Sequence, residues 1–152
     1  MRISELLREE TITTTLQNTE KKAIIEELMA LAEKTGNVKD HEQALQAVME
    51  REEMMSTGLE RGVAIPHAKT NSVENLTLAL GISREGVDFE SADGKPSHLF
   101  FLLMAPEAAA GPNIKVLAQI ARLASDPAFT ETLRQAAGPA DVLNAIRSME
   151  ME

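Results

Sequence analysis

The chain has 152 residues, 43% hydrophobic and 26% charged, a balance typical of one soluble globular domain spanning residues 1–152. It has no cysteine, so disulfides, thiolate catalysis and zinc–thiolate sites are excluded. The formal charge of −9 and the lack of tryptophan and tyrosine argue against nucleic-acid binding and favour a protein partner with a neutral or basic surface.

Residues 1–5 lack the apolar core of a signal peptide, and the chain has no run of about 18 apolar residues, so we expect a cytoplasmic protein that is not embedded in a membrane.

The N-terminal half is predicted to contain one strand and two helices. Residues 11–16 are predicted to form an edge strand, and residues 20–35 a helix that ends at Gly36. A second helix is predicted to begin at the N-cap Asp40, with Gln43 at the capping-box position. Its predicted buried side chains are Ala44, Leu45, Val48, Met49 and Met55.

Strands are predicted next, followed by helices. The four predicted strands are Val63–Ile65, Thr77–Ile82, Val87–Phe89 and Leu99–Met104. A helix is predicted from the N-cap Asn113, another from Asp126-Pro127 to about Ala136, and a last one over residues 141–149. Helices before and after a central sheet predict an α/β fold with α/β/α layers in one domain.

Of the three histidines, His67 is the candidate for chemistry. His41 follows a helix N-cap and is predicted to lie at the surface, and His98 precedes an apolar strand and is predicted to be a hydrogen-bonded structural residue. His67 follows Pro66, which has no N–H and ends strand pairing, so its imidazole is predicted at the point where a strand gives way to a loop. From its type alone, His67 is a candidate nucleophile, proton carrier or ligand.

Several residues near His67 in the sequence are of types that bind anions. Gly58 and Gly62 allow tight turns on either side of the approach to the strand, and Lys69 adds a cation. Arg51 falls on the inward edge of its predicted helix, where its guanidinium either binds phosphate or pairs with a carboxylate such as Glu52 or Glu53. Hydroxyl groups and a helix N-terminus come from Ser56, Thr57 and Asn113.

The sequence lacks the motifs that other reaction classes require. No second histidine stands at metal-ligand spacing from His67, so we expect no metal site. No G-x-S-x-G, Walker A or G-x-G-x-x-G run is present, so we expect no serine hydrolase elbow, and no bound nucleotide or other cofactor. A single imidazole beside an arginine and a helix end suits transient phosphoryl carriage.

The run Gly62-Val63-Ala64-Ile65-Pro66-His67-Ala68, preceded by Arg51-Glu52-Glu53 and Ser56-Thr57-Gly58, resembles the active-site signature of phosphotransferase system enzyme IIA domains. The resemblance is to the fructose/mannitol class, which includes nitrogen-regulatory IIA proteins. It extends from residues 3–7 through residues 100–106 to residues 117–123.

The resemblance implies an α/β/α fold with a mixed sheet and a phosphoryl carrier. His67 would accept the phosphoryl group from phospho-HPr or its nitrogen-branch counterpart, and in transport members the group passes on to a cysteine of a IIB domain. Arg51 would support the phosphate, and Ser56 and Thr57 would supply neighbouring hydroxyls. The chain departs from the family pattern at Asn113, which replaces a second active-site histidine, and at Glu60, which places a negative charge where a small residue is usual.

Three hypotheses follow. The first is a phosphoryl-carrier IIA protein with a regulatory role, because no IIB cysteine or IIC membrane segment is attached. The second, suggested by Asn113 and Glu60, is a binding module that docks on a transporter or kinase without relaying phosphate. The third, a metal-free hydrolase with His67 as base, requires a nucleophile or carboxylate within hydrogen-bond reach of the ring.

Overall fold

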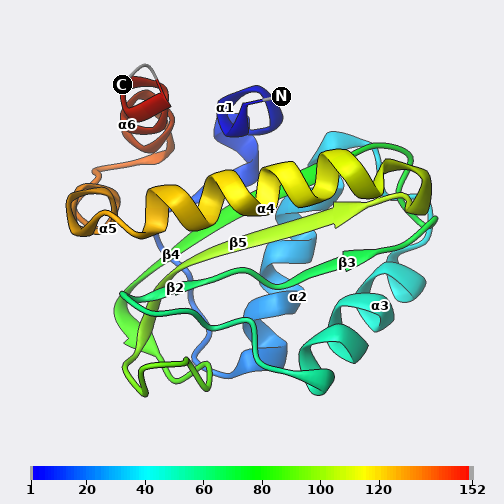
Figure 1. The fold of residues 1–152 in the computed structure, drawn as a ribbon, viewed down its shortest axis with the longest axis horizontal. Helices are drawn as coiled ribbons and strands as arrows, with labels where there is room; N and C mark the ends of the chain where they lie inside the picture. Colours follow the sequence, from blue (N-terminus) through cyan, green and yellow to red (C-terminus); the bar gives the residue numbers. More distant parts are fainter. Residues whose placement is uncertain (1, 151–152) are drawn as a thin grey trace.

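The computed structural model describes residues 2–150, which form six α-helices, three short 3-10 helices and five strands (Figure 1). In chain order these are α1 (Ile3–Leu6), η1 (Glu9–Thr11), β1 (Ile12–Thr13), α2 (Lys21–Ala32), η2 (Glu33–Thr35), α3 (His41–Met54), β2 (Val63–Ala64), β3 (His67–Lys69), β4 (Thr77–Val87), β5 (Ser97–Ala105), η3 (Glu107–Ala109), α4 (Ala110–Ala124), α5 (Pro127–Arg134) and α6 (Pro139–Glu150). No helix in this part of the chain is both long and apolar enough to span a bilayer.

The sheet is mixed, as the family resemblance implied. Its order is β1-β4-β5-β2, and β3 also pairs with β5. The β4–β5 pair is antiparallel, whereas β1 pairs in parallel with β4, and both β2 and β3 pair in parallel with β5. Strands β2 and β3 therefore form one interrupted edge of the sheet.

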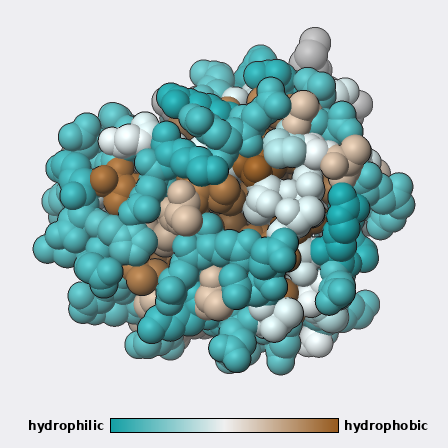
Figure 2. Space-filling view, turned by 180° about the vertical axis from the view of Figure 1, so that it is seen from behind, coloured by the Kyte–Doolittle hydropathy of each residue, from teal (hydrophilic) through white to brown (hydrophobic). Residues whose placement is uncertain are grey.

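Both faces of the sheet are covered, which confirms the predicted α/β/α layers (Figure 1). Along β5, Phe101 and Leu103 belong to the core that includes side chains of α4, α5 and α6, while the alternating Phe100 and Leu102 belong to the core with α2 and α3. The continuous apolar run in β5 is thus explained by burial on both sides. Seen from behind, most of the outer surface is hydrophilic (Figure 2).

Several predicted helix boundaries are confirmed. Gly36 ends η2 in the left-handed conformation with φ 78°, and the Asp40 side chain accepts a hydrogen bond of 3.1 Å from the backbone N–H of Gln43. Asp126 caps α5 by accepting from the N–H of Ala128, and Pro127 is the first helical residue. In each case a local rule of backbone chemistry was sufficient to place the helix boundary.

Other predictions need correction. Met55 is 71% exposed, because α3 ends at Met54 and the chain turns away before this side chain reaches the core. The predicted strand over residues 11–16 is reduced to Ile12–Thr13, and the separate strand predicted from Val87 is the end of the long β4, which continues past an irregularity. Asn113 is not an N-cap, since α4 begins at Ala110 and its N-cap is Ala109.

Candidate functional site

His67 is predicted at the point where a strand gives way to a loop, but it begins a further short strand, β3. Pro66 interrupts the edge between β2 and β3, because it has no N–H to donate, yet its carbonyl accepts from the N–H of Leu103 at 3.0 Å and the edge resumes at once. His67 is the first residue of β3 and pairs with Leu103, which faces the α4 side of the sheet. The strand thus holds the backbone of the histidine rigidly at the sheet edge.

A hydrogen bond fixes the His67 ring. Its Nδ1 lies 2.7 Å from the carbonyl oxygen of Ile65. Because a carbonyl can only accept, Nδ1 carries the proton in the neutral ring, and Nε2 keeps a free lone pair. Burial is the largest influence on the ring and lowers the pKa of His67 below its ordinary value; the Ile65 hydrogen bond raises that pKa, the charge of Arg51 lowers it, and the charge of Glu52 raises it. The net lowering favours a neutral, nucleophilic imidazole near pH 7.

Arg51 reaches the same place from the last turn of α3. One guanidinium nitrogen, Nη1, donates to the carbonyl of Met55 at 3.0 Å, which orients the planar group. None of the ion pairs found in residues 2–150 involves Arg51, so the predicted alternative of a pair with Glu52 or Glu53 is not what the structure shows. The remaining guanidinium donors are therefore open to an anion.

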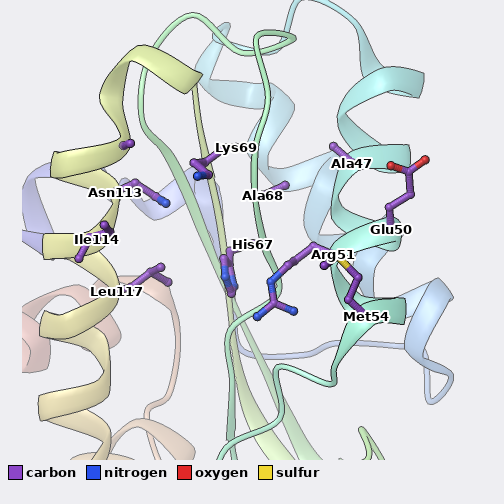
Figure 3. A pocket seen from close by; sticks show the side chains of 11 residues that line it. Ala47, Glu50, Arg51, Met54, His67, Ala68, Lys69, Asn113, Ile114 and Leu117 are labelled. Atoms are coloured by element: carbon purple, nitrogen blue, oxygen red, sulfur yellow. The ribbon is translucent and has the colours of Figure 1, made fainter.

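Asn113 approaches from the opposite side. It is the fourth residue of α4, only 4% of its surface is exposed, and its Oδ1 has no hydrogen-bond partner among the described residues. Figure 3 shows its amide pointing towards His67 from α4, while Arg51 points towards the ring from α3. The first turn of a helix also has unpaired N–H groups and a partial positive charge, which favour an anion here.

These three residues line a pocket of about 370 Å³. The other lining residues are Ala47, Glu50, Met54, Ala68, Lys69, Ala110, Ile114 and Leu117 (Figure 3). The charged residues of the lining are two basic ones, Arg51 and Lys69, and one acidic one, Glu50, so the charge at the pocket favours a negatively charged group.

Ser56 and Thr57 are not brought into the pocket. The Ser56 hydroxyl donates to the carbonyl of Phe89 at 2.7 Å, and the buried Thr57 hydroxyl donates to the carboxylate of Glu52. Both hydroxyls hold the loop after α3 in place, and this geometry gives no support to their predicted contact with phosphate. Glu60 also lies outside the pocket, in a separate depression on the surface that it shares with Ala121.

The other two histidines are placed as predicted. The His98 Nδ1 donates to the carbonyl of Ser83 at 2.9 Å, at the start of β5, and His41 pairs with Glu33 at the surface with a distance of 2.5 Å. Within residues 2–150, no group of three or more histidine, cysteine or acidic side chains forms a metal site. The hydrogen bond of the His67 ring within residues 2–150 goes to a backbone carbonyl, so this part of the chain does not supply the nucleophile or carboxylate that the hydrolase hypothesis requires.

The sequence interpretation missed the role of Glu52. This carboxylate is buried, with 2% of its side chain exposed, and it pairs with Lys21 at 2.8 Å rather than with Arg51. Its position was readable, because Glu52 falls four residues after the buried Val48 on the inner face of the helix. What could not be read was its partner, which comes from another helix.

Comparison with known proteins decides the family. The sequence model for the family described as "Phosphoenolpyruvate-dependent sugar phosphotransferase system, EIIA 2" matches residues 5–149. The chain belongs to this EIIA family. Proteins of this family are components of the phosphotransferase system.

Named relatives of this EIIA chain fall into two groups. It is 41% identical over 123 residues to the "PTS system fructose-specific EIIABC component" of Bacillus subtilis, covering 81% of this chain and 19% of that protein. It is 38% identical over 135 residues to a "Nitrogen regulatory protein" of Bradyrhizobium diazoefficiens, covering 88% and 87% of the two chains. The EIIA chain thus spans about a fifth of the length of the Bacillus protein and most of the nitrogen regulatory one.

Solved structures show the same fold. The nitrogen regulatory protein IIA-Ntr of Neisseria meningitidis superposes with a TM-score of 0.88 at 33% identity, covering 95% of the EIIA chain and 98% of the other. The IIA mannitol protein of Escherichia coli superposes with a TM-score of 0.79 at 22% identity, covering 92% and 98%.

Proposed function

We propose that His67 accepts a phosphoryl group on Nε2 from a phosphohistidine carrier protein, phospho-HPr or its nitrogen-branch counterpart, and passes it on or holds it as a regulatory signal. The proposal rests on one observation above all: the Nδ1–H of His67 is committed to the Ile65 carbonyl, and Nε2 is free in a pocket with excess positive charge. It takes residues 1–152 as one EIIA unit that acts in the cytoplasm.

In the proposed transfer, the Nε2 lone pair of His67 attacks the phosphorus of the donor. A new N–P bond forms as the donor N–P bond breaks, and the electron pair of that bond returns to the donor imidazole. The proton on Nδ1 of His67 stays bonded to Ile65, so the product is a phosphoimidazolium whose positive charge keeps the new N–P bond weak. Arg51 stabilises the phosphoryl oxygens, and the Asn113 amide donates to one of them.

Exposed apolar side chains beside the pocket support a protein as donor. Met54 lines the pocket and is 80% exposed, and Ile114 lines it from the α4 side and is 65% exposed. Large apolar residues with this exposure at the mouth of a site are typical of surfaces that bind another protein. A free small-molecule donor would not need them.

The onward acceptor is proposed by comparison. An NMR structure of enzyme IIA mannitol with phosphorylated enzyme IIB mannitol from Escherichia coli shares the fold, with a TM-score of 0.81 at 21% identity. We therefore propose a IIB domain as one acceptor. The alternative is a regulated transporter or kinase, which the similarity to nitrogen regulatory proteins favours.

The test is to incubate the protein with phosphoenolpyruvate, enzyme I and the carrier protein, and to measure acid-labile phosphate on the chain. We expect the wild type and the surface control His41→Ala to become phosphorylated, and His67→Ala to remain unphosphorylated. Equal labelling of His67→Ala, or no labelling of the wild type with either carrier, would refute the proposal. Adding a IIB domain afterwards separates a relay, which loses its label quickly, from a regulatory module, which retains it.

A further inference from the structure

Glu52 is a buried charged group that the proposed transfer does not use. Its carboxylate receives three hydrogen bonds: from the Lys21 ammonium at 2.8 Å, from the Thr57 backbone N–H at 2.9 Å, and from the Thr57 hydroxyl. Lys21 itself lies 4.6 Å from the centroid of the Phe89 ring and is only 20% exposed. A buried carboxylate is stable only with partners of this kind, so the group is held firmly in one place.

A short series of hydrogen bonds leads from Glu52 to the reacting ring. The carbonyl of Thr57 accepts from the N–H of Ile65 at 3.0 Å, and the carbonyl of Ile65 accepts from Nδ1 of His67 at 2.7 Å. Beside this series, the N–H of Leu59 donates to the carbonyl of Val63 at 2.7 Å. The loop after α3 is thus fastened along β2, and its anchor at the helix end is the Glu52 carboxylate.

Among residues 2–150, no backbone N–H of the turns and loops donates to the carbonyl of Ile65, and the hydrogen bond that this carbonyl accepts comes from the His67 ring. The next residue is Pro66, which lacks an N–H, so β-sheet pairing is interrupted at this point. The direction of the Ile65 carbonyl is therefore set by what holds Ile65 itself, and Thr57 is one of those contacts. A shift of the loop would turn the carbonyl away from Nδ1.

Glu52 also balances charge at the ring. Arg51 and Glu52 are adjacent on α3, and their charges shift the pKa of His67 in opposite directions. Arg51 lines the pocket together with the charged residues Glu50 and Lys69, whereas Glu52 is not part of the lining. A negative group close to the ring favours the phosphoimidazolium, in which Nδ1 keeps its proton. The position of Glu52 and its charge thus both favour retention of the proton on Nδ1 of His67.

We propose that Glu52 is a positioning residue for His67: through Thr57 and Ile65 it holds the carbonyl that keeps the proton on Nδ1 and leaves Nε2 free to react. The inference rests on the proposed function for its effect on phosphoryl transfer. Its effect on the tautomer of the unphosphorylated ring can be measured without any donor protein.

Two variants and two controls test this. Glu52→Gln removes the charge, and its matched control is Glu53→Gln, the same change at the exposed neighbouring residue. Thr57→Val removes one hydrogen bond to Glu52 and keeps the side-chain shape, and Thr57→Ser restores the hydroxyl. Thr57→Val also covers the case in which Glu52→Gln fails to fold.

The first measurement is ¹⁵N NMR of the His67 ring in the full, unphosphorylated chain, above the pKa of the ring. The second is the rate of phosphorylation from the carrier protein. We expect Glu52→Gln and Thr57→Val to populate the Nε2–H tautomer and to react more slowly, by up to about 100-fold, because a misplacement of about 1 Å at a reacting group costs that much. Glu53→Gln and Thr57→Ser should match the wild type in both measurements.

The proposal is overturned if the variants that unfold cooperatively on heating, and are therefore folded, keep the wild-type tautomer and the wild-type rate. This applies to Thr57→Val, and to Glu52→Gln where it folds. A slower rate with an unchanged tautomer also overturns it, because the loss would then come from somewhere other than ring positioning. If the wild type accepts no phosphate but the variants change the tautomer, the proposed function fails and the positioning role stands.

Discussion

Replacing Asn113 by alanine should make the protein more stable and less active. Asn113 is only 4% exposed, and its Oδ1 has no hydrogen-bond partner among residues 2–150. An unpaired buried acceptor costs about 1–3 kcal/mol of folding free energy. Alanine also has the better helix propensity, by up to about 0.7 kcal/mol. Since the side chain lines an open pocket, its removal leaves no closed cavity to offset these gains.

The expected net gain is therefore about 1–3 kcal/mol in the free energy of unfolding, or roughly 2–12 °C in Tm for a chain of this size. The same change removes the proposed donor to the phosphoryl group, and one neutral hydrogen bond of about 0.5–1.5 kcal/mol corresponds to a loss of about two- to tenfold in phosphorylation rate. Thermal and urea unfolding measure the first effect, and phosphorylation from the carrier protein measures the second.

Asn144→Ala is the matched control, because Asn144 is exposed within α6 and its replacement changes helix propensity alone. The reasoning is wrong if Asn113→Ala gains no more stability than Asn144→Ala. It is also wrong if the rate of phosphorylation is unchanged, since the amide would then not contact the phosphoryl group.

Three further predictions follow from the site and its supports. Folding lowers the pKa of His67, so the unfolded chain binds more protons than the folded one just below about pH 6.5. The wild type should therefore lose more free energy of unfolding between about pH 7 and pH 5 than His67→Asn does, as measured by urea titration. An equal loss in the two proteins would contradict this. Gly58→Ala should destabilise the fold by about 1–3 kcal/mol, because the new Cβ would lie 2.9 Å from the backbone Cα of Ser91, and an unchanged Tm would show that this approach is not tight. Arg51→Lys should lower the phosphorylation rate about tenfold or more while leaving Tm unchanged, since lysine keeps the charge but loses the planar, two-pronged donor; a wild-type rate would mean that charge alone suffices.

Much of the fold could be predicted because the signals are local. Gly36, Asp40 and Asp126 mark helix ends through backbone geometry and capping, and these rules depend on a few neighbouring residues. The β5 run is apolar on both faces because helices cover both sides of the sheet. Met55 was placed wrongly because helical periodicity does not show where the helix stops.

The site was only partly predictable. His67, Arg51 and Asn113 lie in one pocket as expected, but the strand that carries His67 is three residues long and pairs only with a distant segment, which no local pattern records. Ser56 and Thr57 stand near His67 in sequence and yet turn their hydroxyls elsewhere. Ser56 bonds to Phe89, which is distant in sequence, and Thr57 bonds to the buried Glu52 near the end of α3.

The interruption of the sheet edge at Pro66 has a consequence for solubility. An open β-edge is a template on which other chains can add strands and aggregate. Here the outer side of β2 is covered by the loop at Gly58, and the stretch left open, β3, is three residues long and ends in the exposed Lys69. This edge is therefore short and ends in a charge, and both features disfavour the addition of a strand from a misfolded chain.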